Sequence, residues 1–224
     1  MESPANNKTK INYQRLCEKT VSSLPLDPKP KLLLHVCCGP CACYPLTYLC
    51  PHFDVTIYYA NSNIYPREEY DHRLATLKEL LGYLKRDHGY DIKLIVPPYD
   101  NENYMKPLRP YADDPEGGRR CFLCYTLRME EAYAFAEKNH FDYFTTVMSV
   151  SRQKDSQKFN EIGEALSQKY VETAYLFSDF KKNKGQEIGT EIRKSYDLYN
   201  QDYCGCEYSY QDALKRRERK EENG

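Results

Sequence analysis

Short apolar runs recur along the chain at intervals that are typical of buried strands. Each run is rich in leucine, β-branched or aromatic residues and is bounded by proline, glycine or charged positions. The runs that predict strands lie at residues 31–36, 54–60, 91–96, 143–148 and 174–177.

Between these runs, apolar residues return at three- and four-residue spacing, which predicts amphipathic helices. The clearest pattern lies between Leu74 and Leu84, behind Pro66, and predicts a helix over residues 66–86. The other predicted helices lie at residues 13–23, 41–50, 121–139, 155–170 and 186–199, with a solvated helix end at 215–220.

Proline and polar residues interrupt this pattern in three places. Pro45 is expected in the first turn of its helix, where its missing N–H costs nothing. Residues 99–120 are rich in proline and glycine and predict a long loop. The two ends, residues 1–12 and about 212–224, are expected to be flexible.

Strand and helix alternate about five times, which predicts an α/β fold. We expect a single domain over residues 1–224, with a mainly parallel sheet of about five strands flanked by helices. In open α/β sheets, ligands bind beyond the carboxyl ends of the strands. Cys37 and Cys38 lie just past the first predicted strand, so a site is expected there.

The composition narrows the possible functions. The 224 residues carry a formal net charge of −1, which excludes nucleic-acid binding through bulk charge but not through a local basic patch. Neither G-x-G-x-x-G nor G-x-x-x-x-G-K-[ST] occurs, so the common nucleotide-binding loops are not expected. No apolar run has the length of a membrane span, and the first ten residues lack the apolar stretch of a secretory signal. A cytoplasmic protein with no membrane partner is therefore expected.

Ten cysteines are the exceptional feature of the sequence. In a reducing compartment, clustered cysteines bind metal or do redox chemistry more often than they form disulfides. Seven of the ten lie in three clusters: Cys37, Cys38 and Cys41; Cys121 and Cys124; and Cys204 and Cys206. The remaining Cys17, Cys43 and Cys50 are expected to pack as small hydrophobic residues.

The spacing within each cluster favours metal binding. Cys121 and Cys124 share one face at a helix start, where the helix dipole is expected to lower the thiol pKa. The glycine between Cys204 and Cys206 allows the backbone to fold tightly around a ligand. Adjacent side chains diverge, so Cys37 and Cys38 are expected to serve two neighbouring centres. Seven thiols suffice for a four-sulfur site and a second ion with an open position, and spacing does not distinguish zinc from an iron–sulfur cluster.

These cysteine segments resemble the epoxyqueuosine reductase QueH family. The resemblance is carried by HVCCGPC from His35, RCFLC from Arg120 and YCGCEYS from Tyr203, and it extends over roughly residues 10–210. It implies an oxidoreductase that converts epoxyqueuosine to queuosine at the tRNA wobble position, the last step of queuosine biosynthesis, without cobalamin. It also implies an adenine-nucleotide α-hydrolase-like fold with the metal site at the carboxyl ends of the strands.

The resemblance further implies a [4Fe-4S] cluster and a second, mononuclear iron. We expect Cys38, Cys41, Cys121 and Cys124 to hold the cluster and Cys37, Cys204 and Cys206 to hold the second iron, although no spacing rule separates Cys37 from Cys38. The expected partners are tRNAs with a GUN anticodon, those for tyrosine, histidine, asparagine and aspartate, and an electron donor of unknown identity.

Several other residues are candidates for lesser roles. The best phosphate contacts on the substrate side are Arg109, Arg119, Arg120, Lys181, Lys182 and Lys184. His35 is expected to be a satisfied core histidine, and Asp155 and Asp179 are expected to be surface carboxylates. The sequence identifies no catalytic acid. Two other functions stay open, a dithiol oxidoreductase that uses Cys121 and Cys124, and a zinc-stabilised RNA-binding module.

Overall fold

The structure, a computed structural model, describes residues 11–221 and contains one five-stranded sheet. All neighbouring strands are parallel, and their order is β3-β2-β1-β4-β5. The strands are β1 (Lys31–His35), β2 (Asp54–Tyr58), β3 (Lys93–Ile95), β4 (Tyr143–Thr146) and β5 (Ala174–Tyr175). The α/β class and the five parallel strands confirm the fold class predicted from the sequence.

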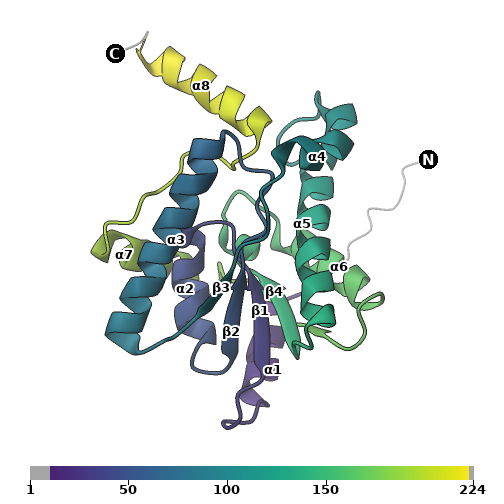
Figure 1. The fold of residues 1–224 in the computed structure, drawn as a ribbon, viewed down its shortest axis with the longest axis vertical. Helices are drawn as coiled ribbons and strands as arrows, with labels where there is room; N and C mark the ends of the chain where they lie inside the picture. Colours follow the sequence, from purple (N-terminus) through teal and green to yellow (C-terminus); the bar gives the residue numbers. More distant parts are fainter. Residues whose placement is uncertain (1–10, 222–224) are drawn as a thin grey trace, which may run out of the picture.

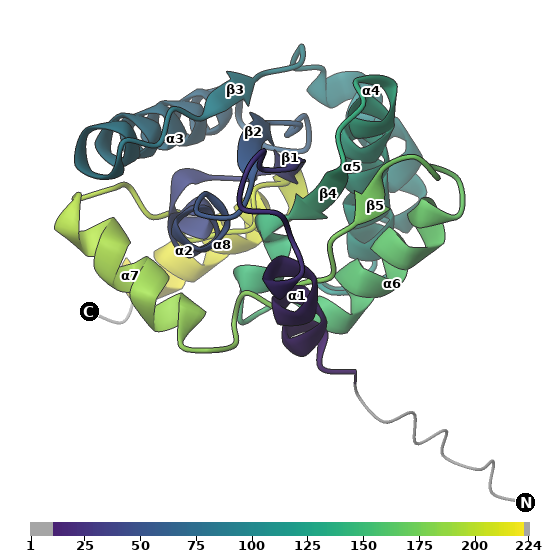
Figure 2. The same ribbon diagram turned by 90° about the horizontal axis from the view of Figure 1, so that it is seen from below.

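Helices cover both faces of this sheet. The helices are α1 (Tyr13–Ser22), α2 (Gly39–Leu49), α3 (Arg67–His88), α4 (Asn101–Met105), α5 (Arg119–Lys138), α6 (Ser156–Ser167), α7 (Gly185–Ser195) and α8 (Glu207–Glu221), with short 3₁₀ helices at Lys106–Tyr111 and Val147–Val150. On one face α2 packs against α3 and α7, and on the other α5 packs against α6 (Figure 2). No helix in the described part of the chain is long and apolar enough to cross a membrane.

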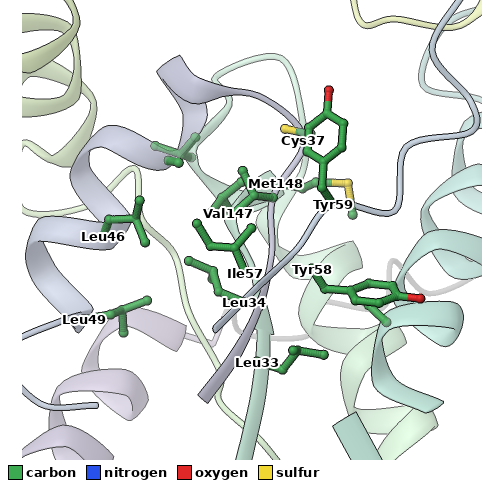
Figure 3. Close-up of a cluster of buried hydrophobic side chains, with 14 of the residues drawn as sticks. Leu33, Leu34, Cys37, Leu46, Leu49, Ile57, Tyr58, Tyr59, Val147 and Met148 are labelled. Atoms are coloured by element: carbon green, nitrogen blue, oxygen red, sulfur yellow. The ribbon is translucent and has the colours of Figure 1, made fainter. Parts of the chain in front are cut away.

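The core lies between the sheet and these helices. The first strand is buried along nearly its whole length, with Leu32, Leu33 and Leu34 fully inaccessible, because helices pack on both of its faces. Cys37 lies at the upper end of the same cluster, beside Tyr59 and Met148 (Figure 3). The thiol-bearing segment is therefore built directly on the rigid centre of the sheet.

Three sequence expectations need correction. Pro45 lies in the interior of α2, because that helix already begins at Gly39. Residues 99–120 are not a continuous loop, since Asp100 caps α4 by accepting a hydrogen bond from the Asn103 N–H at 3.1 Å. The C-terminal helix is also much longer than the end predicted at residues 215–220.

The terminal segments were expected to be flexible. Residues 1–10 and 222–224 lie outside the described residues, whereas residues 212–221 form the later part of α8. The same helix crosses above the carboxyl edge of the sheet, on the side where α3 and α5 begin (Figure 1).

Candidate metal centre

The three cysteine clusters come from separate elements that all reach the carboxyl edge of the sheet. Cys37 and Cys38 follow β1, and Cys41 lies in the first turn of α2. Cys121 and Cys124 occupy the first two turns of α5, and the Cys204–Cys206 segment leads into α8. A cavity of about 710 Å³ opens between them, and its walls include Cys37, Cys41 and Cys204.

Cys37, Cys38 and Cys41 form a compact group of sulfurs, which we call the thiol trio. All three Sγ atoms lie within 4.8 Å of one another. Cys37 and Cys38 are buried, and Cys41 is half-buried. All ten cysteines are free, so no disulfide competes for these sulfurs.

The trio fits a metal ion that prefers thiolate ligands. The Cys37 and Cys38 Sγ atoms lie 3.8 Å apart. Two thiolates on one tetrahedral ion, with metal–sulfur bonds of about 2.3 Å, are separated by roughly the same distance. The expectation that these adjacent side chains diverge is therefore wrong. Cys38 is in extended conformation at the N-cap of α2, where the chain changes direction between strand and helix.

Hydrogen bonding within the trio distinguishes its three thiols. The Cys38 and Cys41 thiols, together with Lys154 and Arg128, hold the pKa of Cys37 well below its ordinary value despite burial. Burial and the neighbouring Cys37 raise the pKa of Cys38 to about 12, and Cys37 raises that of Cys41. Cys37 is therefore the thiol of the trio whose pKa its neighbours lower, and thiolate is the form in which cysteine binds metal.

We call the other four clustered cysteines the thiol quartet: Cys121, Cys124, Cys204 and Cys206. Among the described residues, only the trio brings three such ligand atoms within 4.8 Å of one another. Burial raises the pKa of Cys121, and the nearby Cys204 and Cys206 raise it further. Burial likewise raises the pKa of Cys124 to about 11, with the same two cysteines contributing. Burial thus outweighs the helix dipole that was expected to lower both values.

The trio keeps Cys37 with Cys38 and Cys41, whereas the division expected from the sequence placed Cys37 with Cys204 and Cys206. The three cysteine segments reach the carboxyl edge through different crossovers, so their separation along the chain does not show how close their sulfurs lie.

Arg73 holds the Cys204–Cys206 segment in place from α3. Its guanidinium donates to the carbonyl oxygens of Cys204 at 3.0 Å and Tyr203 at 3.1 Å, and its charge is balanced by Glu69 at 2.7 Å. Gly205 has a φ of +130°, and its carbonyl accepts a hydrogen bond of 2.7 Å from the Tyr65 N–H. The tight fold expected around this glycine is present.

Two further residues next to the clustered cysteines, Lys154 and Gln201, were not identified from the sequence. Lys154 lines the cavity, and although burial lowers its pKa, Cys204 and Cys37 raise it more, so the net value is raised. Gln201 donates to Cys38 Sγ at 2.9 Å, while its own Oε1 is buried without a hydrogen-bond partner. Lys154 lies in the loop between β4 and α6, and Gln201 lies in the loop between α7 and α8. Loops at the carboxyl edge of a parallel sheet commonly carry functional residues, so the position of these loops could have indicated both residues.

The six basic residues expected to contact phosphate occupy different environments. Arg109, Lys182 and Lys184 are exposed. Arg119 is exposed and paired with Asp114 at 2.9 Å. Arg120 is buried, and it donates to backbone carbonyls of the preceding loop at 2.5–3.2 Å.

Lys181 is half-buried and donates to the Lys154 carbonyl oxygen at 2.8 Å. It therefore braces the loop that carries the cavity lysine. None of the six lies in the wall of the cavity itself, within the part of the chain that is described.

The remaining candidates are settled by burial. His35 is fully buried and bonded to Thr146 Oγ1 at 2.8 Å, which confirms a core histidine, and burial with Arg128 nearby lowers its pKa to about 3. Asp155 is exposed and caps α6, as expected of a surface carboxylate. Asp179 is buried and accepts from Ser156 at 3.0 Å, so its expected surface position is wrong. Cys17, Cys43 and Cys50 are buried, consistent with packing roles.

The fold and the site define a class, a single α/β unit with seven clustered cysteines near the carboxyl edge of its sheet and a cavity that three of them line. A sequence model described as epoxyqueuosine reductase QueH matches residues 32–212. The chain belongs to the epoxyqueuosine reductase QueH family.

Curated relatives agree with this family over most of the chain. The epoxyqueuosine reductase QueH of Streptococcus pyogenes is 37% identical over 205 residues, which cover 91% of this chain and 80% of the relative. That of Staphylococcus aureus is 36% identical over 203 residues, covering 89% and 84%. That of Thermotoga maritima is 28% identical over 191 residues, covering 84% and 93%.

Proposed function

We propose that this protein reduces epoxyqueuosine to queuosine at the wobble position of tRNA, as the last, cobalamin-independent step of queuosine biosynthesis. The observation that carries this proposal is the cavity walled by Cys37 and Cys41 of the trio and by Cys204 of the quartet, in a chain of this family. The reaction converts an epoxide to an alkene. It consumes two electrons and two protons and releases the epoxide oxygen as water. The five-stranded order is compatible with the adenine-nucleotide α-hydrolase-like fold.

The donor sets suggest how two iron centres would be held. The quartet supplies the four thiolates that a [4Fe-4S] cluster takes, and the trio supplies three thiolates to a second iron that keeps an open position. When bound, these groups would supply single electrons and a Lewis acid for the epoxide oxygen. The mutual proximity of the three trio sulfurs supports this division over the one expected from spacing.

The cavity suits one modified nucleoside. Its volume of about 710 Å³ lies within the range of small-ligand pockets. A wobble base must leave the anticodon stack to reach thiols at the base of such a cavity. Lys154 projects its Nζ over the Tyr125 ring at 5.6 Å in the cavity wall, so it is placed to donate a hydrogen bond to the departing epoxide oxygen.

The tRNA backbone would lie around the cavity mouth. The exposed Arg109, Arg119, Lys182 and Lys184 remain candidates for phosphate contacts, in tRNAs with a GUN anticodon. Arg120 and Lys181 support this surface from beneath, because their cationic groups bond to backbone carbonyls. Because the net charge is −1, binding should depend on this local surface and should weaken as salt rises.

Purification without oxygen tests the proposal. We expect a brown protein with about five irons per chain, one cluster and one further iron, that reduces epoxyqueuosine in tRNA with an artificial electron donor. A colourless zinc protein that binds tRNA without turnover would favour an RNA-binding module. Turnover that needs only a Cys121–Cys124 disulfide cycle would favour a dithiol oxidoreductase.

Two serine variants test the division of the thiols. Cys204→Ser should lose the visible cluster absorption, whereas Cys38→Ser should keep it and lose about one iron. The opposite pair of results would support the division expected from the sequence. Both variants should lack reductase activity, so metal content and absorption are the decisive measurements.

A further inference from the structure

A buried arginine follows the clustered cysteines of α5. Arg128 follows Cys124 by one turn of α5 and is only 2% exposed. Its Nη2 donates to Asn61 Oδ1 at 2.6 Å and lies 3.4 Å from His35 Nε2. Its Nε is buried without a hydrogen-bond partner.

No carboxylate forms an ion pair with Arg128 within residues 11–221. Glu131, three residues further along α5, feels its charge but accepts a hydrogen bond from Tyr58 instead. Asn61, which accepts its 2.6 Å hydrogen bond, carries no charge. Arg73, another buried arginine of the site, contrasts with it because Glu69 neutralises Arg73.

An arginine does not give up its proton in a protein, so this charge is permanent. Such a charge is unfavourable in the protein interior unless an opposite charge offsets it. Arg128 lies one turn after Cys124 on α5, and its Nη2 is 3.4 Å from Nε2 of His35, two residues before Cys37. The chain therefore positions this charge next to segments of both the quartet and the trio.

We propose that Arg128 is the fixed counter-cation of the metal centre, placed so that its positive charge stabilises the reduced, more negative state of the bound iron. The inference rests on the proposed function, because it takes iron as the occupant of the thiols. Arg128 would be a positioning residue rather than a catalytic one, since it is buried and is not part of the cavity wall. The positive charge of Arg128 should raise the reduction potential of the metal centre, so that an electron donor reduces the centre more easily.

The midpoint potential of the anaerobically purified protein tests this inference directly. Potentials are measured by mediator titration followed by electron paramagnetic resonance of the reduced cluster. Arg128→Gln should shift the potential to a more negative value, because the charge is lost, and Arg128→Lys should keep it near that of the unchanged protein. Arg67→Gln is the matched control. Arg67 is exposed and paired with Asp71 at 3.1 Å, so losing its solvent-screened charge should leave the potential unchanged.

A second variant keeps the test decisive if Arg128→Gln fails to fold. Aspartate has nearly the same shape as asparagine. Asn61→Asp therefore puts a carboxylate oxygen at the position of Asn61 Oδ1, which Arg128 Nη2 already contacts. The new carboxylate would neutralise Arg128, so the potential should again become more negative. An unchanged potential in Arg128→Gln, or in Asn61→Asp if Arg128→Gln does not fold, would overturn the inference while leaving the proposed function intact. A protein that holds no iron would instead overturn the cofactor assignment and this inference with it.

Discussion

Replacing Gly205 with alanine should damage the thiol quartet through the backbone alone. The φ of Gly205 is +130°, a conformation that side-chain-bearing residues rarely adopt. An added Cβ would lie 3.0 Å from Arg73 Nη1 and 3.3 Å from Ile64 Cγ1. Arg73 cannot retreat easily, because its guanidinium already binds Glu69 and two carbonyls of the same segment.

The expected magnitude follows from two opposing effects. Holding a residue with a Cβ at this φ costs about 1–3 kcal/mol. Alanine restricts the unfolded chain more than glycine does, which returns about 0.4–1 kcal/mol. The free energy of unfolding should therefore fall by about 1–2 kcal/mol, which lowers Tm by about 2–8 °C in a chain of this size.

Gly82 provides the matched control on α3. It is exposed in the helix interior, and an added Cβ would meet nothing within 4 Å. Gly82→Ala should raise the free energy of unfolding by about 0.5–1 kcal/mol. The two alanine variants should therefore change stability in opposite directions.

Urea unfolding of the metal-free, reduced proteins measures both effects, and iron per chain measures the consequence for the site. Gly205→Ala should bind less iron than Gly82→Ala under the same reconstitution. If Gly205→Ala unfolds at the same urea concentration as the unchanged protein and binds the same iron, the strain and the role of Arg73 are refuted.

Three further predictions concern metal, tRNA and core packing. Cys38→Ala should lose part of the bound metal, whereas Cys43→Ala should keep it, because the Cys43 thiol bonds to the Gly39 carbonyl at 3.5 Å and is not part of the trio. Equal metal content in the two variants would contradict the trio as a metal site. Arg216→Gln should weaken tRNA binding and reduce its salt dependence more than Arg217→Gln does. Arg216 lines the cavity and bonds to a neutral carbonyl, whereas Asp202 neutralises Arg217 at 2.8 Å. Filter binding across a salt series measures both variants, and identical slopes would contradict this prediction. Gly163→Ala should lower the free energy of unfolding by about 1–3 kcal/mol or more, since its Cβ would fall 2.1 Å from the Tyr175 ring, and a urea midpoint equal to that of the unchanged protein would refute the contact.

The sequence alone was informative wherever structure depends on local pattern. Short apolar runs predicted all five strands, and leucine spacing predicted α3, because a buried strand and an amphipathic helix each leave a period in the chain. The seven clustered cysteines and the family resemblance identified the type of chemistry before any contact was known. The pattern was less informative at Pro45 and at residues 99–120, where helical turns form despite residues that usually interrupt them.

Only the tertiary structure decided which thiols meet and what surrounds them. Parallel crossovers bring the three cysteine segments, which are distant in the chain, to one edge of the sheet. Residues of the same type also differ in their surroundings. Asp155 is exposed and Asp179 is buried, and Arg73 forms an ion pair with a carboxylate whereas Arg128 does not. The charge balance and solvent exposure of a residue depend on all the side chains packed around it. Those side chains come from distant segments, so no single segment of the sequence determines either property.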